Sequence, residues 1–255
     1  MPHHRMSRRR FLTHALQVTA PFLLAGCDSL TETAWFPTVL SKAEGVTQRV
    51  QRLLTPRRAM AQEYTAAELS ANFPANGNTA PTDATYQQLA SNNFMDWHLE
   101  VSGGVEQPGQ FSLADLRQLP TRTQITRHDC VEGWSAIGKW KGVPLRDVLT
   151  RVKPLPTARY VVFHCADVDE DRIAYYESID FDDAYHAQTI LAYEMNDQPL
   201  DIAHGAPLRL RVERQLGYKM AKYVMRIELV ESFAALAGGK GGYWEDQGYE
   251  WYAGI

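Results

Sequence analysis

The sequence predicts a mixed α+β domain over residues 86–255, preceded by appendages that do not belong to its core. The chain has 255 residues, of which 45% are hydrophobic, which is enough for one substantial domain but not for two. Several segments of the C-terminal part alternate apolar and polar residues, the pattern of half-buried strands. Helical patterns stand between them in no regular strand–helix repeat, which favours an α+β fold over a parallel α/β fold.

A strand and a short helix are predicted at the start of this domain. Apolar residues alternate with polar ones over residues 97–101 and precede a Gly-Gly pair, which predicts a strand that ends in a turn. The sequence Ser-Leu-Ala-Asp at residues 112–115 has the spacing of a capping box. It predicts a short helix that ends before Pro120.

The remaining predicted elements are one amphipathic helix and several strands. Residues 145–152 carry apolar side chains at positions i, i+3, i+4 and i+7, with a proline in the first turn, which predicts a helix with one buried face. Residues 160–165 predict a strand, and residues 190–200 predict a hairpin that turns at an Asn-Asp pair. Alternation over residues 208–212 predicts a half-buried strand with arginines near the domain surface, and residues 225–229 predict another strand.

Residues 1–27 are predicted to be an export signal with a lipid-attachment site. Residues 7–12, Ser-Arg-Arg-Arg-Phe-Leu, resemble a twin-arginine signal, and an acid-free, moderately apolar stretch follows them. The stretch is too short for a spanning helix. It ends in Leu-Ala-Gly-Cys, which resembles a bacterial lipobox with Cys27 as the lipidated residue, and Asp28 favours retention at the inner membrane. The alternative is a plain secretory signal in which Cys27 is incidental.

The predicted export route also carries chemical information. Twin-arginine substrates cross the membrane already folded, usually because a cofactor has been inserted in the cytoplasm. We therefore expect a periplasmic protein, anchored to the inner membrane if Cys27 is lipidated, and the signal favours a complex redox cofactor.

Residues 28–85 are predicted to form a tether or extended arm. They show little periodicity and are rich in Ala, Thr, Asn and Pro, with a short helix expected over residues 46–54. A tether would suit a lipid-anchored enzyme. The alternative is an irregular arm that packs on the domain.

Charge is unevenly distributed along the chain. The formal net charge is −4, but residues 1–26 hold four arginines and no acid, so 22 basic and 30 acidic residues remain, a charge of −8. This acidic body argues against nucleic-acid binding and is compatible with docking of a basic redox partner. Within this acidic chain, five basic residues lie close together in sequence, and such a cluster suits the binding of an oxyanion. The alternative is that they form a solvated strand edge. The cluster consists of Arg209, Arg211, Arg214, Lys219 and Lys222.

Three hypotheses account for the cysteines that remain once Cys27 is assigned to the lipobox. In an exported protein, Cys130 and Cys165 could form a disulfide. With His128 and His164 they could bind zinc, although adjacent residues of a strand point to opposite faces and the usual short ligand spacing is absent. Alternatively, Cys130 alone supplies a thiolate to a sulfur-rich metal centre such as a molybdenum dithiolene. The cysteines by themselves leave these alternatives open.

The surroundings of Cys130 resemble a known family. Residues 127–135, Arg-His-Asp-Cys-Val-Glu-Gly-Trp-Ser, are followed by Gly-Val-Pro-Leu at residues 142–145. Both segments resemble the cysteine region of the sulfite oxidase family of molybdopterin-dependent oxidoreductases. The branch that they resemble most is that of the periplasmic methionine sulfoxide reductase catalytic subunits. The resemblance implies that Cys130 ligates molybdenum.

Three further stretches resemble the same family in the expected order, so that the resemblance covers residues 91–231. They are Asn-Asn-Phe-Met-Asp at residues 92–96, His-Gly-Ala-Pro-Leu-Arg at residues 204–209 and Gly-Tyr-Lys-Met-Ala-Lys at residues 217–222. Met and Asp replace a Tyr and a Glu of the first motif. Besides Cys130, the resemblance implies cofactor contacts by Asn92, Met95, Asp96, Cys165, His204, Arg209, Lys219 and Lys222. Cys165 stands where the reductase branch has a threonine, and Lys222 is the candidate for the pterin phosphate.

The resemblance also implies a fold and an activity. The fold is the mixed-sheet sulfite-oxidase-type molybdopterin-binding domain, without the C-terminal dimerisation domain. One molybdenum–molybdopterin per chain would catalyse oxygen-atom transfer, as sulfoxide reduction or as sulfite-type oxidation, on a small or sulfur-containing substrate. Arg127 and Trp134 are candidates for the catalytic pocket beside Cys130.

Electrons are expected to pass to or from a separate protein. The sequence shows no haem or iron–sulfur motif, so a membrane b-type haem subunit or a cytochrome is the expected partner. The alternative function is an exported lipoprotein binding module on the same fold without turnover. A C-terminal run of glycines and aromatic residues, 238–252, could form a flap over a substrate entrance or seal the domain edge.

Overall fold

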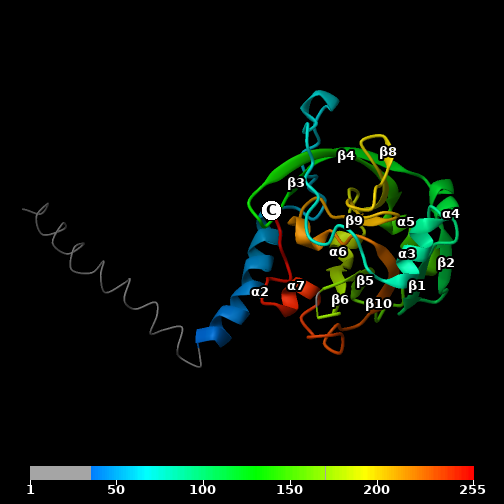
Figure 1. The fold of residues 1–255 in the computed structure, drawn as a ribbon. Coiled ribbons are helices and arrows are strands. Elements are labelled where there is room, and N and C mark those ends of the chain that lie inside the picture. Colours follow the sequence, from blue (N-terminus) through cyan, green and yellow to red (C-terminus); the bar gives the residue numbers. More distant parts are fainter. Residues whose placement is uncertain (1–35, 170) are drawn as a thin grey trace, which may run out of the picture. The chain divides into compact units, whose positions relative to one another are not determined.

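The computed structural model describes residues 36–169 and 171–255 (Figure 1). The chain divides into two compact units, residues 1–51 and residues 52–255. Helix α2, Phe36–Leu54, is longer than the helix expected over residues 46–54 and runs across this division. The predicted export signal lies outside the described residues. The predicted domain belongs to the second unit.

A mixed five-stranded sheet forms one half of the domain. Its strand order is β2-β1-β10-β5-β6. Strands β1 and β10 are parallel, with Val101 opposite Ile227, and the other neighbours are antiparallel. The strands are β1 (His98–Gly103), β2 (Gly109–Ser112), β5 (Tyr160–Val168), β6 (Ala174–Asp180) and β10 (Val224–Val230).

The second sheet is antiparallel and also has five strands, of which β3, β4, β8 and β9 are labelled in Figure 1. Its order is β3-β4-β7-β8, and β9 pairs with β7. Asn196 and Asp197 turn the predicted hairpin between β7 and β8 with positive φ angles of 50° and 63°, as a two-residue hairpin turn requires. The strands are β3 (Arg122–Asp129), β4 (Ser135–Pro144), β7 (Ile190–Met195), β8 (Gln198–Pro199) and β9 (Arg209–Arg211).

Short helices connect the strands. The predicted capping box is present, because Ser112 accepts a hydrogen bond from the Asp115 amide and the Asp115 carboxylate accepts from the Ser112 amide. The helices of the domain are η1 (Ala66–Glu68), α3 (Ala84–Ser91), α4 (Leu113–Gln118), α5 (Leu145–Val152), α6 (Phe181–Ala184), η2 (Gly217–Lys219) and α7 (Tyr243–Asp246). Together the two sheets and these helices confirm the predicted mixed α+β class.

One hydrophobic core joins the two sheets. It contains Leu99 and Ile227 from the first sheet and Val143 and Leu191 from the second. Helix α5 buries all four of its predicted apolar positions in the same core, because their spacing places them on one face.

One strand prediction was wrong. The arginines of β9 do not lie near the domain surface, because Arg209 is 3% exposed and Arg211 is fully buried. Both guanidinium groups lie over the ring of Trp140, at 4.8 and 4.3 Å from its centroid. Arg211 also forms a buried ion pair with Glu213 at 2.6 Å. Alternation in the sequence shows that two faces differ, but it does not show that the polar face is solvated.

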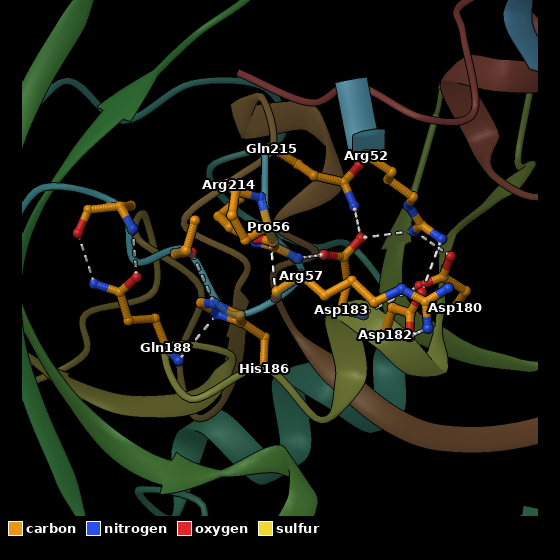
Figure 2. Close-up of polar contacts among 12 residues, drawn as sticks. Arg52, Pro56, Arg57, Asp180, Asp182, Asp183, His186, Gln188, Arg214 and Gln215 are labelled. Carbon is orange, nitrogen blue, oxygen red and sulfur yellow. Dashed lines mark hydrogen bonds and ion pairs between the residues drawn. The ribbon is translucent and has the colours of Figure 1, made fainter. Parts of the chain in front are cut away.

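The segment before α3 packs on the domain through backbone contacts. The Tyr64 amide donates to the Ile125 carbonyl at 2.9 Å, and Phe73 is buried in a cluster with Trp140. The side chain of Gln188, labelled in Figure 2, forms hydrogen bonds with both backbone groups of Ala61, at 2.8 and 3.0 Å. Of the two interpretations of residues 28–85, the packed arm therefore describes residues 59–78. Residues 28–35 lie outside the described residues.

Candidate functional site

Cys130 occupies the first position of the turn that joins β3 to β4. Two backbone hydrogen bonds close this turn, from the Cys130 amide to the Trp134 carbonyl at 2.9 Å and from the Gly133 amide to the Cys130 carbonyl at 3.0 Å. Gly133 has a φ of 90°, which glycine adopts without strain. The closed turn holds the cysteine at a fixed place beyond the end of the hairpin.

The Cys130 thiol is nearly buried and contacts the arm. It is 7% exposed, and its Sγ accepts a hydrogen bond from Asn76 Nδ2 at 3.4 Å. Burial raises the pKa of the thiol, so that the uncharged form is favoured in the protein alone. A metal ion that binds this sulfur would displace its proton.

Two basic side chains approach each other around Gly205. A Cβ atom at Gly205 would stand 3.0 Å from Cβ and Cγ of Lys222 and 3.2 Å from Cβ of Arg209. Its φ of 106° is also one that other residues rarely adopt. Glycine at this position therefore allows Arg209 and Lys222 to lie side by side.

These two cations hydrogen-bond to backbone carbonyls and have no carboxylate within ion-pair distance among the described residues. Arg209 Nη1 donates to the His204 carbonyl at 2.9 Å, while its buried Nε has no hydrogen-bond partner there. Lys222 Nζ donates to three carbonyls, at 2.7, 2.5 and 3.1 Å, which belong to Asn76, Asn78 and Ala203. Neither cation therefore has a direct ion pair among the described residues, and carboxylates such as Asp167 and Asp201 act on Lys222 only at longer range.

Burial and repulsion by neighbouring arginines lower the pKa values of Arg209 and Lys222. Burial, followed by the charge of Arg211, lowers the pKa of Arg209 to about 9. Burial, followed by the charge of Arg209, lowers the pKa of Lys222 to about 8. Since Arg209 is buried and Lys222 partly buried, and neither has a direct ion pair among the described residues, an anionic ligand would stabilise both of them.

A cavity of about 250 Å³ joins the thiol to the two cations. Cys130, Arg209 and Lys222 all line it. Its walls are built by the arm, the β3–β4 turn, the end of β5, the segment around η2 and the C-terminal segment. The volume is close to the lower limit of about 300 Å³ for ligand pockets.

Asp167 adds a carboxylate to the cavity wall. It is 7% exposed, and its Oδ1 has no hydrogen-bond partner among the described residues. Burial raises the pKa of Asp167 to about 6. A buried acceptor without a partner suits the N–H groups of a ligand.

Aromatic side chains of the C-terminal segment form another part of the wall. Trp244 stacks on Tyr249 with ring centroids 5.2 Å apart, and Tyr243 stacks on Tyr175 at 5.5 Å. All four residues line the cavity. Three aromatic residues of the predicted run 238–252 therefore line the cavity, as the interpretation of a flap over a substrate entrance requires.

Comparison with known proteins decides the family. The model of the oxidoreductase molybdopterin-binding domain matches residues 86–235. The chain belongs to this family. The residues present fit the group that the family binds, because one cavity offers a soft sulfur, two uncompensated cations for a phosphate and a buried carboxylate for ring N–H groups.

Several relatives of this molybdopterin domain carry informative names. A protein of Azospira oryzae, provisionally named protein-methionine-sulfoxide reductase subunit YedZ1, is 37% identical over 97% of this chain and 88% of its own length. The protein-methionine-sulfoxide reductase catalytic subunit MsrP of Xanthomonas campestris is 35% identical over 72% of this chain and 62% of its own length. The MsrP of Campylobacter jejuni is 33% identical over 56% of this chain and 52% of its own length. Among solved structures, the sulfane dehydrogenase SoxCD of Paracoccus pantotrophus matches with a TM-score of 0.49 and 20% identity, over 70% of this chain and 46% of that chain.

Lys219 of the molybdopterin domain lies away from the cavity lining. It is fully buried and forms ion pairs with Glu177 and Glu245. Although burial alone would lower it, these two carboxylates raise the pKa of Lys219. Its charge is already compensated by these carboxylates, and a cofactor contact by Lys219 stays a prediction.

The two residues predicted for the catalytic pocket do not line the cavity. Arg127 points to the other face of β3 from His128, where its Nε pairs with Asp129 at 2.9 Å and its side chain is half exposed. Trp134 Nε1 donates to Glu132 at 2.9 Å, and its ring lies 5.4 Å from that of His128. Their catalytic roles stay predictions.

The first motif lies outside the cavity lining as well. Asn92 Nδ2 donates to Asp96 at 2.6 Å, and Met95 is largely exposed at 76%. The buried Oδ1 of Asn92 has no partner in the described chain, so it keeps a free acceptor. Cofactor contacts by these residues stay predictions.

His204 and Cys165 lie near the cavity without lining it. The ring of His204 is held between Asp201 at 2.7 Å and the Phe73 carbonyl at 3.0 Å, and its own carbonyl receives Arg209. Cys165 Sγ lies 4.0 Å from the Phe163 carbonyl. Cofactor contacts by His204 and Cys165 stay predictions.

The other two cysteine hypotheses find no support in the structure. Cys130 and Cys165 are both free thiols. Within residues 36–169 and 171–255, no three His, Cys, Asp or Glu side chains gather as metal ligands. Of the two described cysteines, only Cys130 lines the cavity that Arg209 and Lys222 also line.

Sequence reasoning missed two residues of the site. Asp167 follows Cys165 by two residues at the end of β5, where the pairing with β6 is irregular, and no periodic pattern marked it. Asn76, which binds the Cys130 sulfur, belongs to the arm, and no pattern there pointed to the site.

Proposed function

We propose that this molybdopterin oxidoreductase is a periplasmic sulfoxide reductase that binds one molybdenum–molybdopterin per chain, with Cys130 as the metal ligand. The proposal depends on one observation, that a lone buried thiol shares a cavity with two cations that lack acidic partners. A metal dithiolene with a phosphate group would satisfy both features. The alternative function, a binding module without turnover, gives no comparable reason for a thiol and two cations in one cavity.

Each part of the cofactor has a matching residue. Cys130 would bind the metal, and Arg209 with Lys222 would compensate the phosphate. Asp167 would accept hydrogen bonds from N–H groups of the pterin, which would remove the cost of its unpartnered Oδ1. When bound, the cofactor supplies two-electron oxygen-atom transfer.

The remaining wall of the cavity favours a neutral substrate over an anion. Glu132 and Asp169 line it together with aromatic rings such as Trp244 and Tyr249. Carboxylates and the electron-rich faces of aromatic rings would repel sulfite, whereas a sulfoxide is uncharged and its sulfur packs well against such rings. The chain's own contribution is therefore to bind the thioether part, to orient the S=O group and to exclude water.

A sulfoxide that is reduced accepts two electrons and two protons and yields a thioether and water. We infer that the electrons come from a separate haem protein of the inner membrane. Relatives are named as subunits, and as catalytic subunits, of protein-methionine-sulfoxide reductases, which supports a partner subunit and a methionine sulfoxide substrate. The twin-arginine-like segment at residues 7–12 supports export to the periplasm with the cofactor in place.

The proposal is tested on protein matured in a host that makes the cofactor. We expect about one molybdenum and one pterin per chain, reduction of methionine sulfoxide with a reduced viologen dye, and no oxidation of sulfite. Cys130→Ser should lose both molybdenum and at least about a thousandfold of the activity, because the hydroxyl is a poor ligand for a soft, sulfur-rich metal centre.

Cys165→Ser is the matched control. It changes the other described free cysteine, which does not line the cavity, to a hydroxyl residue like the threonine that the reductase branch carries at this position, so it should keep molybdenum and turnover. A Cys130→Ser protein that retains metal and activity would refute the ligand assignment. A protein without metal after co-expression with the cofactor pathway would favour the binding module.

A further inference from the structure

The C-terminal half of α2 presents an unusual exposed apolar surface. Val46, Val50, Leu53 and Leu54 follow one another at i, i+4, i+7 and i+8, which places them on one face of the helix. Their exposed fractions are 57%, 50%, 87% and 76%. Single exposed apolar residues are common, but four on one helical face are not accounted for by the fold.

The same segment carries positive charge without any acid. Residues 45–62 contain four arginines, Arg49, Arg52, Arg57 and Arg58, and no Asp or Glu. Arg49, Arg57 and Arg58 are exposed. This local charge is opposite to that of the acidic remainder of the chain.

Ion pairs hold the end of this segment to the domain, as Figure 2 shows. Arg52 pairs with Asp180 and, at 3.1 Å, with Asp182, and Arg57 pairs with Asp182 at 3.2 Å. Arg214 Nη1 donates to the Arg57 carbonyl at 3.0 Å.

These contacts fix the backbone around residues 52–57. Leu53 and Leu54 lie within this segment, which the ion pairs hold against the domain, and they remain exposed. The domain itself therefore does not bury them. An apolar surface held in this way is available to an external partner.

We propose that this face of α2, with its flanking arginines, binds the surface of a bilayer that contains anionic lipids. An amphipathic helix whose apolar stripe is flanked by Arg residues lies in the plane of the membrane interface, with the stripe among the acyl chains. Exposed arginines add attraction to anionic headgroups. The described helices include none of the length and apolarity that would cross a bilayer, so contact with the membrane would be confined to the interface.

The positive charge of this segment favours an anionic lipid surface over a second copy of the chain as the partner. A second copy would bring the same arginines against each other, which is unfavourable, whereas an anionic bilayer compensates them. The contact is independent of the catalytic proposal. It would hold the domain at the membrane in addition to any lipid on Cys27, so the test removes that residue.

The test uses the cofactor-loaded chain that begins at Asp28, which lacks the predicted signal and Cys27. Its binding is measured by sedimentation with vesicles of phosphatidylglycerol and phosphatidylethanolamine, and with vesicles of phosphatidylcholine alone. We expect binding to the anionic vesicles that weakens with added salt. Leu53→Gln with Leu54→Gln should weaken it at least about tenfold. Arg49→Gln should weaken it about fivefold, because each arginine near the surface contributes about 1 kcal/mol.

Leu155→Gln is the matched control. It replaces another exposed leucine, which lies in the turn after α5, and it should leave vesicle binding unchanged. Molybdenum content and turnover should be unchanged in every variant, so that a failure here is separate from a failure of the proposed enzyme function.

Three outcomes would overturn the proposal. The first is an absence of binding to either vesicle, and the second is binding that the leucine variant does not weaken. The third is a dimer in solution that the leucine variant dissociates, which would assign the face to a second copy of the chain.

Discussion

Lys219 and Lys222 are three residues apart in one motif, yet the structure gives them opposite surroundings. Lys219 is fully buried between the carboxylates of Glu177 and Glu245. Lys222 reaches backbone carbonyls and lines the cavity with no acidic partner among the described residues. The charge of the first lysine is paired within the fold, whereas the second lysine presents its charge at the cavity, where we propose that a ligand binds.

The two arginines of β9 repeat this contrast. Arg211 pairs with Glu213 through two hydrogen bonds at 2.9 and 2.6 Å and also contacts His128 Nδ1 at 3.0 Å. Arg209 lies at the cavity without a carboxylate partner in the described chain, and its pKa is lowered to about 9 by burial and by Arg211. Removing one partner of a buried ion pair is costly, whereas a buried cation without an ion pair leaves a charge that a ligand could satisfy.

The strongest test of this contrast is Lys219→Met. It would leave two buried carboxylates without their cation, and losing one partner of a buried ion pair costs about 3–5 kcal/mol of unfolding free energy. Urea unfolding of the variant measures this loss. Lys139→Met, which removes the more exposed pair with Asp197, is the control and should cost no more than about 1 kcal/mol. Equal effects of the two substitutions would refute the compensated role of Lys219.

Asp167→Asn tests the uncompensated acid of the cavity. Burial raises the pKa of this carboxyl from 3.8 to about 6, so the folded protein loses stability as the pH rises from about 4 to about 6. In cofactor-free protein at pH 7 the variant should be more stable by up to about 3 kcal/mol, at 1.36 kcal/mol per pKa unit. The difference should vanish below about pH 4, because the native carboxyl is then protonated in both states.

Thermal unfolding at several pH values follows this difference. A variant that is less stable than the native cofactor-free chain at pH 7 would show that Asp167 has a compensating partner. In the loaded protein the gain should shrink or reverse, because the carboxylate then accepts hydrogen bonds from the pterin.

Arg209→Met should separate ligand binding from stability. The cofactor-free chain should change by about 1 kcal/mol or less, because the substitution also removes the cost of an uncompensated charge. Pterin retention on dilution should fall about tenfold or more, since a charged hydrogen bond contributes about 1.5–3 kcal/mol. Fluorescence of the released, oxidised pterin measures it. A variant that retains the cofactor fully would exclude Arg209 from the phosphate site.

The sequence by itself determined the class of the domain and most of its elements. Apolar periodicity predicted α5 and β1, a capping box predicted α4, and an Asn-Asp pair predicted the hairpin of β7 and β8. These signals are local, since each depends on residues that lie within a few positions of one another in the sequence. The motif around Cys130 likewise identified the family that the comparison confirmed.

The tertiary structure alone decided which charges are free. Lys219, Lys222 and Arg209 look alike in the sequence, because the carboxylates that pair with Lys219 lie on distant segments and none pairs with the other two in the described chain. Contacts of the arm with Cys130 and Lys222 also join residues more than fifty positions apart. Electrostatic compensation depends on distance in space, and a linear pattern does not contain that distance.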